Sequence, residues 1–324
     1  MSYALIFGCV AALASLAAGQ PFVAYLRGRN IGKAISTDGP ESHLTKAGTP
    51  TMGGLLFTSV IVVIALAAAV PKDRAVLLPI IIMAVFAAMG FYDDLGTLID
   101  REKREAHDRT TMIVKLIGFT AVAIVAAWFL SDRIDAPRLL IPHYGAYHMP
   151  AALYIPLAIA VIISMTSAVG VTDGIDMLAG STSAVAFAAF GSIALTQHQT
   201  GLATFCFVTV GALVGFLWYN AYPARLFMGD TGSLPLGASL AVVALMTGWW
   251  LLLPVVGIVF VIEILSDVIQ IGSYRLRGGK RVFRMAPLHI HFEKAPTHEV
   301  TVTLRFGALG VVGAMLALAL VALD

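Results

Sequence analysis

Two adjacent carboxylates, Asp93 and Asp94, stand where a long apolar run ends in the segment GFYDDLG. Acidic side chains at the C-terminal end of a helix oppose the helix macrodipole, so this position is electrostatically unfavourable without a counter-charge. A bound cation would supply that charge, and Mg²⁺ commonly bridges one or two carboxylates to substrate phosphates. The alternative is a pair of solvated acids that ends a helix.

Two further acidic segments are flanked by glycine. In VTDGIDM, Asp173 and Asp176 are three residues apart around Gly174, and the two carboxylates would share one face if a helix begins there. In FMGDTGS, Asp230 lies between glycines just before an apolar run. Each of these acids could instead be a helix N-cap or a turn residue. Three such segments in a chain with few charges favour one shared site over unrelated caps.

A histidine pair follows a basic stretch near the C-terminus. His289 and His291 are two residues apart in PLHIHFE, and an extended segment would point both rings the same way. No third His or Cys lies close by in the sequence, which argues against zinc. Neighbouring cations favour hydrogen bonds from this segment to pyrophosphate oxygens. These cations are Lys280, Arg281 and Arg284.

Glu263 and Asp267 lie four residues apart inside another apolar run. Acids within a membrane-spanning helix are costly and count as functional hypotheses by default. A structural role, in which they hydrogen-bond to a neighbouring helix, explains them equally well.

The composition places these residues in a membrane protein. Of the 324 residues, 59% are hydrophobic and 12% are charged, whereas soluble domains carry about 25% charged residues. The net charge of +2 gives no general attraction to nucleic acid. A membrane-spanning helix needs about 20 apolar residues. The predicted spans are 3–26, 53–71, 75–92, 111–130, 151–169, 178–197, 201–219, 233–249, 251–272 and 303–323. We expect the first to be a retained span rather than a cleaved signal peptide, since no basic residue precedes it.

Basic residues orient these spans. Lys and Arg favour cytoplasmic loops, and most of those outside the spans fall in the odd-numbered loops. The even-numbered loops hold only Lys72, Arg74, Arg133 and Arg138. We therefore expect an all-α integral membrane protein, with residues 1–324 forming a single polytopic domain. Both termini should lie outside, and the Asp and His segments should lie in cytoplasmic loops.

Several of these segments together point to one family. The strings are SHLTKAGTPTMGG, GFYDD, TDGID, YNAYPARLFMGDTGSLPLG and GKRVFRMAPLHIHFE. In order and context the chain resembles the phospho-N-acetylmuramoyl-pentapeptide transferase family over essentially its whole length. The resemblance implies ten spans in the bacterial inner membrane and a Mg²⁺-dependent reaction. That reaction moves phospho-MurNAc-pentapeptide from UDP-MurNAc-pentapeptide to undecaprenyl phosphate, giving UMP and lipid I for peptidoglycan synthesis. A homodimer is left open.

The resemblance also implies roles by position. Asp230 corresponds to the magnesium ligand, while Asp93 and Asp94 correspond to residues that serve the lipid phosphate, with Asp93 as a candidate base. His289 joins this catalytic set. The residues implied to bind the soluble substrate are Lys46, Thr51, Asp173, Gly174, Asp176, Asn220, Phe227 and His291. Of these, Asp176 and Phe227 would hold the uracil. Direct attack and an aspartyl-phosphate intermediate remain alternatives.

Four positions depart from the family pattern. Thr97 stands where lysine is usual, Gly170 where asparagine is usual, and Ile290 in the middle of a three-histidine string. Met177 replaces a glycine. The cations that would replace the lost lysine if the loop folds back are Arg101, Lys103 and Arg104. The departures keep open a transferase for another UDP-N-acetylhexosamine, and a weakened homologue that binds nucleotide or lipid. A transporter is disfavoured, because the sequence shows no internal repeat and its polar residues gather at one interface.

Overall fold

The structure is a computed structural model of the chain, and it describes residues 1–29, 31–32, 46, 48–99, 104–132, 138–295 and 297–323. Most of this part of the chain is helical. The helices are α1 (Ser2–Gly28), α3 (Gly54–Ala68), α4 (Leu77–Ile99), α5 (Arg104–Asp132), α6 (Ala151–Thr172), α7 (Leu178–Thr196), α8 (Thr200–Asn220), α9 (Asp230–Thr247), α10 (Leu253–Val256), α11 (Ile258–Leu276), α12 (Leu288–Glu293) and α13 (Glu299–Ala322). Short 3-10 turns, η1 (Arg74–Val76) and η2 (Trp250–Leu252), precede α4 and α10.

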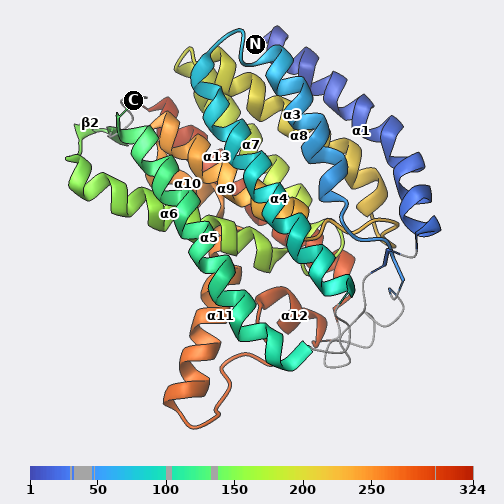
Figure 1. Cartoon of the computed structure of the whole chain (residues 1–324). Coiled ribbons are helices and arrows are strands. Elements are labelled where there is room, and N and C mark those ends of the chain that lie inside the picture. Colours follow the sequence, from blue (N-terminus) through green and yellow to red (C-terminus); the bar gives the residue numbers. More distant parts are fainter. Residues whose placement is uncertain are drawn as a thin grey trace.

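Helix α9 forms the centre of the bundle. In its most apolar window 89% of the residues are buried, compared with 28% in α1, and α3, α4, α6 and α7 all pack against it (Figure 1). Lipid offers helices no hydrophobic driving force for association, so close contact between small residues has to stabilise such packing. A Cβ atom at Gly90 of α4 would lie 2.2 Å from the carbonyl oxygen of Asp230. This glycine therefore permits the crossing that brings the end of α4 to the start of α9.

The predicted spans correspond to helices, but two of them differ from simple crossings. Within the described residues, eight helices are long and apolar enough to cross a membrane, or nine if a bent pair is counted as one span. The predicted span 53–71 is the 15-residue helix α3, which is shorter than the others. The predicted span 251–272 is broken: Trp250–Val256 and Ile258–Leu276 meet at an angle of 81°. A hydropathy average does not detect such a break, although Gly257 at the bend is a local signal of it.

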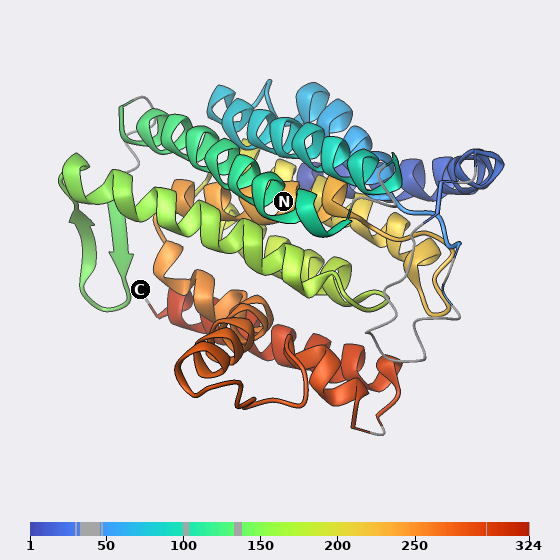
Figure 2. The same ribbon diagram turned by 60° about the horizontal axis from the view of Figure 1, so that its bottom comes forward.

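After the bend, α11 packs against α6 and α13 (Figure 2). Figure 1 shows α12 and the loop that follows α11 at the lower end, and both chain termini at the upper end. Within the described residues, the all-α prediction is confirmed apart from one antiparallel hairpin between α5 and α6. Its strands are β1 (Arg138–Ile141) and β2 (Gly145–His148).

Candidate active site

Asp94 holds the start of α9. Its side chain is buried; Oδ1 accepts the backbone N–H of Asp230 at 3.1 Å, and Oδ2 accepts the N–H and hydroxyl of Thr231 at 3.1 and 2.6 Å. The first N–H groups of a helix lack partners within that helix and carry its positive partial charge. The acid near the end of α4 is therefore compensated by the N-terminus of α9. This contact stabilises the negative charge of one of the two adjacent acids, Asp94, and leaves that of Asp93 to be explained.

Asp93 meets a cation that the sequence analysis overlooked. The Lys115 ammonium of α5 forms an ion pair with Asp93 and lies 3.4 Å from Oδ2 of Asp230. Asp230 is the first residue of α9, where the helix dipole stabilises a carboxylate. Carboxylates from α4 and α9 thus converge on one ammonium group from α5. The Lys115 ammonium therefore offsets the repulsion between the Asp93 and Asp230 carboxylates.

The donor set of this cluster suits magnesium. Carboxylate oxygens are the ligands that Mg²⁺ prefers, and this ion usually binds through one or two carboxylates, water and substrate phosphates. Asp93 and Asp230 offer such oxygens at a spot that already attracts an ammonium group. The described residues contain no group of three or more His, Cys, Asp or Glu that could hold a metal alone. Asp93 and Asp230 would therefore supply only part of the ligands of a Mg²⁺ ion.

The TDGID segment forms a tight turn between α6 and α7 rather than the start of a helix. The condition under which Asp173 and Asp176 would share a helix face is not met, because α7 begins only at Leu178. Asp173 accepts the backbone N–H of Gly229 at 3.2 Å, which ties this turn to the residue before Asp230. Asp176 points to other partners. The turn thus connects two regions of the site.

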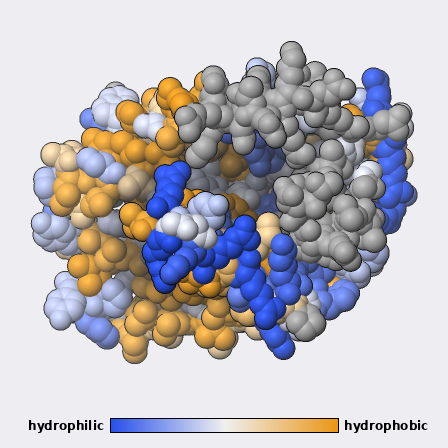
Figure 3. Space-filling view, turned by 90° about the horizontal axis from the view of Figure 1, so that it is seen from below, coloured by the Kyte–Doolittle hydropathy of each residue, from blue (hydrophilic) through white to orange (hydrophobic). Residues whose placement is uncertain are grey.

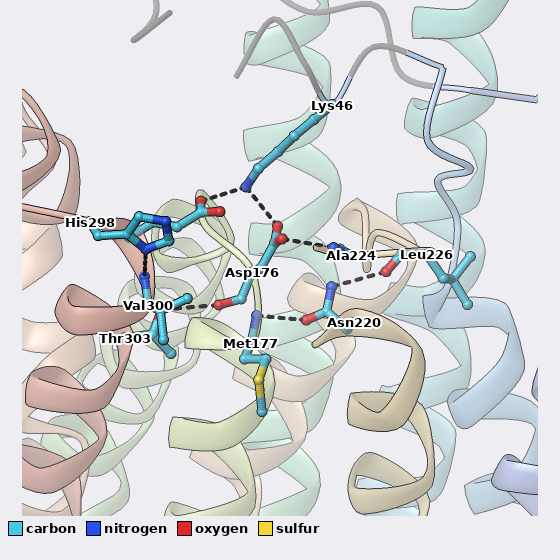
Figure 4. Close-up of polar contacts among 10 residues, drawn as sticks. Lys46, Asp176, Met177, Asn220, Ala224, Leu226, His298, Val300 and Thr303 are labelled. Carbon is cyan, nitrogen blue, oxygen red and sulfur yellow. Dashed lines mark hydrogen bonds and ion pairs between the residues drawn. The ribbon is translucent and has the colours of Figure 1, made fainter. Parts of the chain in front are cut away.

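Lys46 joins Asp176 to the start of α13, as Figure 4 shows. Its Nζ lies 2.8 Å from Asp176 Oδ1 and 2.5 Å from Glu299 Oε2, and Asp176 Oδ2 accepts the N–H of Ala224 at 2.9 Å. Burial alone would lower the pKa of Lys46, but the hydrogen bonds and charges of the two acids outweigh burial and raise it. We call Lys46, Asp176 and Glu299 the lysine clasp.

Asn220 fastens the same region from the end of α8. Its Oδ1 accepts the N–H of Met177 and its Nδ2 donates to the carbonyl of Leu226, both at 2.9 Å (Figure 4). Phe227 is half-buried, and its backbone bonds to Pro50 and Gly53 on either side of the buried Thr51. The residues predicted to hold the nucleotide thus lie on segments joined by hydrogen bonds.

The two histidines face different surroundings. Leu288–Glu293 is helical, so the prediction of an extended segment with parallel rings is wrong; residues two apart on a helix point in nearly opposite directions. His289 is buried, with Nδ1 3.0 Å from Glu263 Oε2. His291 is half-buried, and its Nδ1 accepts the N–H of Arg284 at 3.0 Å. Because Nδ1 of His291 accepts, Nε2 carries the proton of the neutral ring.

The departures from the family pattern lie close to these segments. The Thr97 hydroxyl donates to the carbonyl of Asp94 in its own helix, at 2.8 Å, and so supplies no charge. Lys115 brings a cation to this place from α5. Of the cations proposed to replace the missing lysine, Arg101 and Lys103 lie outside the described residues, and so does the side chain of Arg104. Gly170 lies in the last turn of α6, where its carbonyl accepts the N–H of Asp173.

Sequence reasoning missed two site residues, Lys115 and Glu299. Lys115 was hidden within an apolar run, although an ionisable residue in such a run is itself a functional signal. Glu299 lies four residues before the predicted start of the last span and begins α13. Asp267 is half-buried and lines a separate cavity of about 300 Å³ with Arg275 and Arg281, which contains none of the predicted site residues.

Comparison with known proteins gives the family. A model of glycosyl transferase family 4 matches residues 76–248, and a signature of phospho-N-acetylmuramoyl-pentapeptide transferases matches residues 46–57. A transferase of that name from Chloroflexus aggregans is 42% identical, and the match covers 99% of this chain and 90% of the relative. The chain belongs to the phospho-N-acetylmuramoyl-pentapeptide transferase family.

Other members of the transferase family also match nearly end to end. The relative from Moorella thermoacetica is 40% identical, and the one from Clostridium acetobutylicum is 34% identical; each match covers 94% of this chain and 95% of the relative. The recognition made from the sequence motifs is confirmed. Together with its apolar helices, this makes the chain a multi-pass membrane transferase. Figure 3 shows hydrophilic side chains gathered at the end of the molecule seen from below, bordered by hydrophobic flanks.

Replacing Lys46 by methionine should weaken binding of the nucleotide donor more than turnover. The change leaves Asp176 and Glu299 facing each other without a cation, and we expect a loss of about 2–3 kcal/mol in the free energy of unfolding. The KM for the UDP-linked donor should rise about tenfold or more, because the turn that carries Asp176 loses its anchor. Steady-state kinetics and thermal unfolding measure the two effects.

A compensating variant tests this explanation. Adding Glu299→Gln to Lys46→Met removes the repulsion and should recover part of the stability. The pKa of Lys46 is raised above its ordinary value of 10.5, so the clasp contributes fully below that value and is lost only as the pH rises beyond it. A difference in the free energy of unfolding between wild type and Lys46→Met that changed between pH 6 and 9 would contradict this account.

Proposed function

We propose that this transferase moves phospho-MurNAc-pentapeptide from UDP-MurNAc-pentapeptide to undecaprenyl phosphate, releasing UMP and forming lipid I. The observation that carries the proposal is the cluster of Asp93, Lys115 and Asp230 at the ends of membrane-length apolar helices. A lipid phosphate and a soluble pyrophosphate can meet only at such a boundary. The names of the relatives support the same reaction.

In this reaction an oxygen of the lipid phosphate attacks the phosphorus attached to the sugar. The bond to the bridging oxygen breaks, and UMP leaves with the bonding electrons. Catalysis of phosphoryl transfer depends mainly on positioning and charge neutralisation. In this proposal Asp93 accepts the proton of the lipid phosphate, and Lys115, its ion-pair partner, neutralises charge beside it. Asp94 fixes the backbone that carries Asp230.

Magnesium would be held by Asp230 with Asp93 close by, and it would neutralise charge on the donor pyrophosphate. His289 and His291 offer ring nitrogens to phosphate or sugar oxygens. The lysine clasp, Asn220 and Phe227 lie at the nucleotide end, where their hydrogen-bonded backbone supports the uridine site. These roles divide the site into a reacting end and a recognition end.

The membrane orientation is part of the proposal. We infer that the end of the bundle carrying α12 faces the cytoplasm of a bacterial inner membrane, with both termini outside. The excess of Lys and Arg in the loops at that end supports this orientation. UDP-linked sugars are cytoplasmic, so the site would then face its soluble substrate. A homodimer stays a prediction.

The test is UMP release by the purified protein with undecaprenyl phosphate, Mg²⁺ and UDP-MurNAc-pentapeptide. We expect release that stops when the lipid is omitted or when EDTA removes the metal, and that resumes when Mg²⁺ is added back. Release with UDP-N-acetylglucosamine but not with the muramoyl donor would assign the protein to another sugar. No release with either donor, in a protein that still binds uridine nucleotides, would overturn the proposed activity.

A further inference from the structure

Glu263 is a buried acid whose described partners include one titratable group. Its side chain has no exposed surface. Oε1 accepts the backbone N–H of His289 at 3.1 Å, and Oε2 lies 3.0 Å from Nδ1 of the same residue. Among the described residues, no Lys or Arg forms an ion pair with it, and Asp267 one turn along α11 adds a like charge. Burying a carboxylate is costly unless it is paired. His289 therefore contacts this buried carboxylate through both its backbone N–H and its ring.

The contact fixes the state of the imidazole ring. A carboxylate accepts hydrogen bonds, so the proton of the ring lies on Nδ1 and the ring cannot turn without losing that bond. Nε2 is then the nitrogen left for another molecule. Within the described part of the chain it is buried and has no hydrogen-bond partner. Buried polar atoms rarely lack a hydrogen-bond partner, so we expect Nε2 to bond to a bound molecule.

The free nitrogen faces the turn between α6 and α7. A Cβ atom added to Gly174 would lie 2.0 Å from Nε2 of His289, so the ring rests directly on the turn between α6 and α7. The neighbouring residue of this turn, Asp173, holds the N–H of Gly229 beside Asp230. Nε2 thus lies next to the segment that leads to the carboxylate cluster. We call this arrangement, with the Glu263 carboxylate on one side of the ring and the partnerless Nε2 on the other, the Glu263–His289 relay.

We propose that Glu263 is a positioning residue, which holds His289 with Nε2 directed at a hydroxyl oxygen of the donor. The inference rests on the proposed function, since it acts through His289. With the proton on Nδ1, Nε2 is an acceptor that a donor hydroxyl can bond to, and Glu263 keeps the ring in that tautomer. The acid itself touches no substrate. This assigns a function to one of the two membrane acids that the sequence left without one.

The variant that tests this is Glu263→Gln, which keeps the size of the side chain and an acceptor for the N–H of His289. We expect turnover to fall about 10–100-fold, as when other carboxylates that orient a histidine are removed. The KM for the UDP-linked donor should stay within about threefold, because the donor contacts remain. A rise in KM alone, with turnover unchanged, would overturn the proposal.

A double-variant cycle separates positioning from general damage. In the His289→Ala background, Glu263→Gln should cause little further loss, because the group through which it acts is gone. Equal losses in both backgrounds would contradict the relay. Ser266→Ala is the matched control: Ser266 is buried in the same helix, and its hydroxyl bonds only to the backbone carbonyl of Glu263. This control should keep wild-type turnover.

An NMR measurement tests the contact in two further cases, an inactive protein and a poorly folded Glu263→Gln variant. In wild-type protein labelled with ¹⁵N-histidine, the His289 Nδ1 proton should give a low-field resonance, which Glu263→Gln removes and Glu263→Asp partly restores. This signal does not depend on turnover, so it tests the contact even if no donor is turned over and the proposed function fails. It also serves if Glu263→Gln folds poorly, because Glu263→Asp retains the charge. Absence of the signal in folded wild-type protein would overturn the proposal.

Discussion

Replacing Asp230 by asparagine should reduce UMP release by roughly 10²–10³-fold or more at saturating substrate, since an aligned charge at the reacting group is lost. The substitution removes one of two carboxylates that converge on Lys115 and would attract Mg²⁺. Asparagine retains an oxygen but no charge, so its affinity for a hard cation is much lower. The measurement is the initial rate of UMP release across a magnesium titration.

The fold should survive this change. The backbone N–H of Asp230, and not its carboxylate, bonds to Asp94 and anchors α9. Loss of a favourable charge in the first helical turn should cost no more than about 1 kcal/mol. Asp73→Asn is the matched control, because Asp73 caps η1 through the N–H of Ala75 and asparagine caps equally well. A rate within tenfold of wild type for Asp230→Asn would rule out its role as metal ligand.

The sequence predicted the spans and the Asp segments because hydropathy and glycine-flanked acids are local signals. It could not predict which helices cross. The convergence of Asp94 on α9 depends on Gly90, whose missing side chain allows contact with the carbonyl of Asp230. That contact joins residues 140 positions apart in a 324-residue chain. No local pattern contains it.

The same limit explains the residues that were missed. Lys115 is the one Lys or Arg of the predicted span 111–130. Its role becomes clear only when Asp93 and Asp230 are found around it. Its charge could have been noticed, because an ionisable residue in an apolar run is a signal in itself. Glu299 gave no comparable signal, since an acid in the first turn of a helix is ordinary. Its role in the lysine clasp needs Lys46, 253 positions away.

The motifs were better at naming residues than at placing side chains. The prediction for His289 and His291 assumed an extended backbone, whereas α12 sends one ring to Glu263 and the other to Arg284. Short apolar segments do not distinguish strand from helix by period alone. Asp94 stays a predicted catalytic residue, and the structure adds that both of its carboxylate oxygens accept hydrogen bonds from the start of α9.

Replacing Lys115 by methionine should lower turnover about 100-fold, because a positive charge is removed from the place where negative charge accumulates. Methionine keeps much of the apolar length of lysine, so packing against α4 should change little. The change should also lower the magnesium concentration needed for half-maximal activity. An ammonium near two carboxylates repels a divalent cation, and its removal leaves a more negative site. The two effects therefore move in opposite directions.

This opposition makes the result informative. A simple loss of folded protein would reduce turnover and leave the magnesium midpoint unchanged, whereas loss of a charge at the metal site moves the midpoint downward. Lys72→Met is the matched control, because the Lys72 ammonium lies 4.6 Å from the ring of Tyr3 and belongs to the turn between α3 and α4. It should change neither quantity. A higher magnesium requirement in Lys115→Met would instead mean that the lysine helps to assemble the carboxylates for the metal, and the charge argument would be wrong.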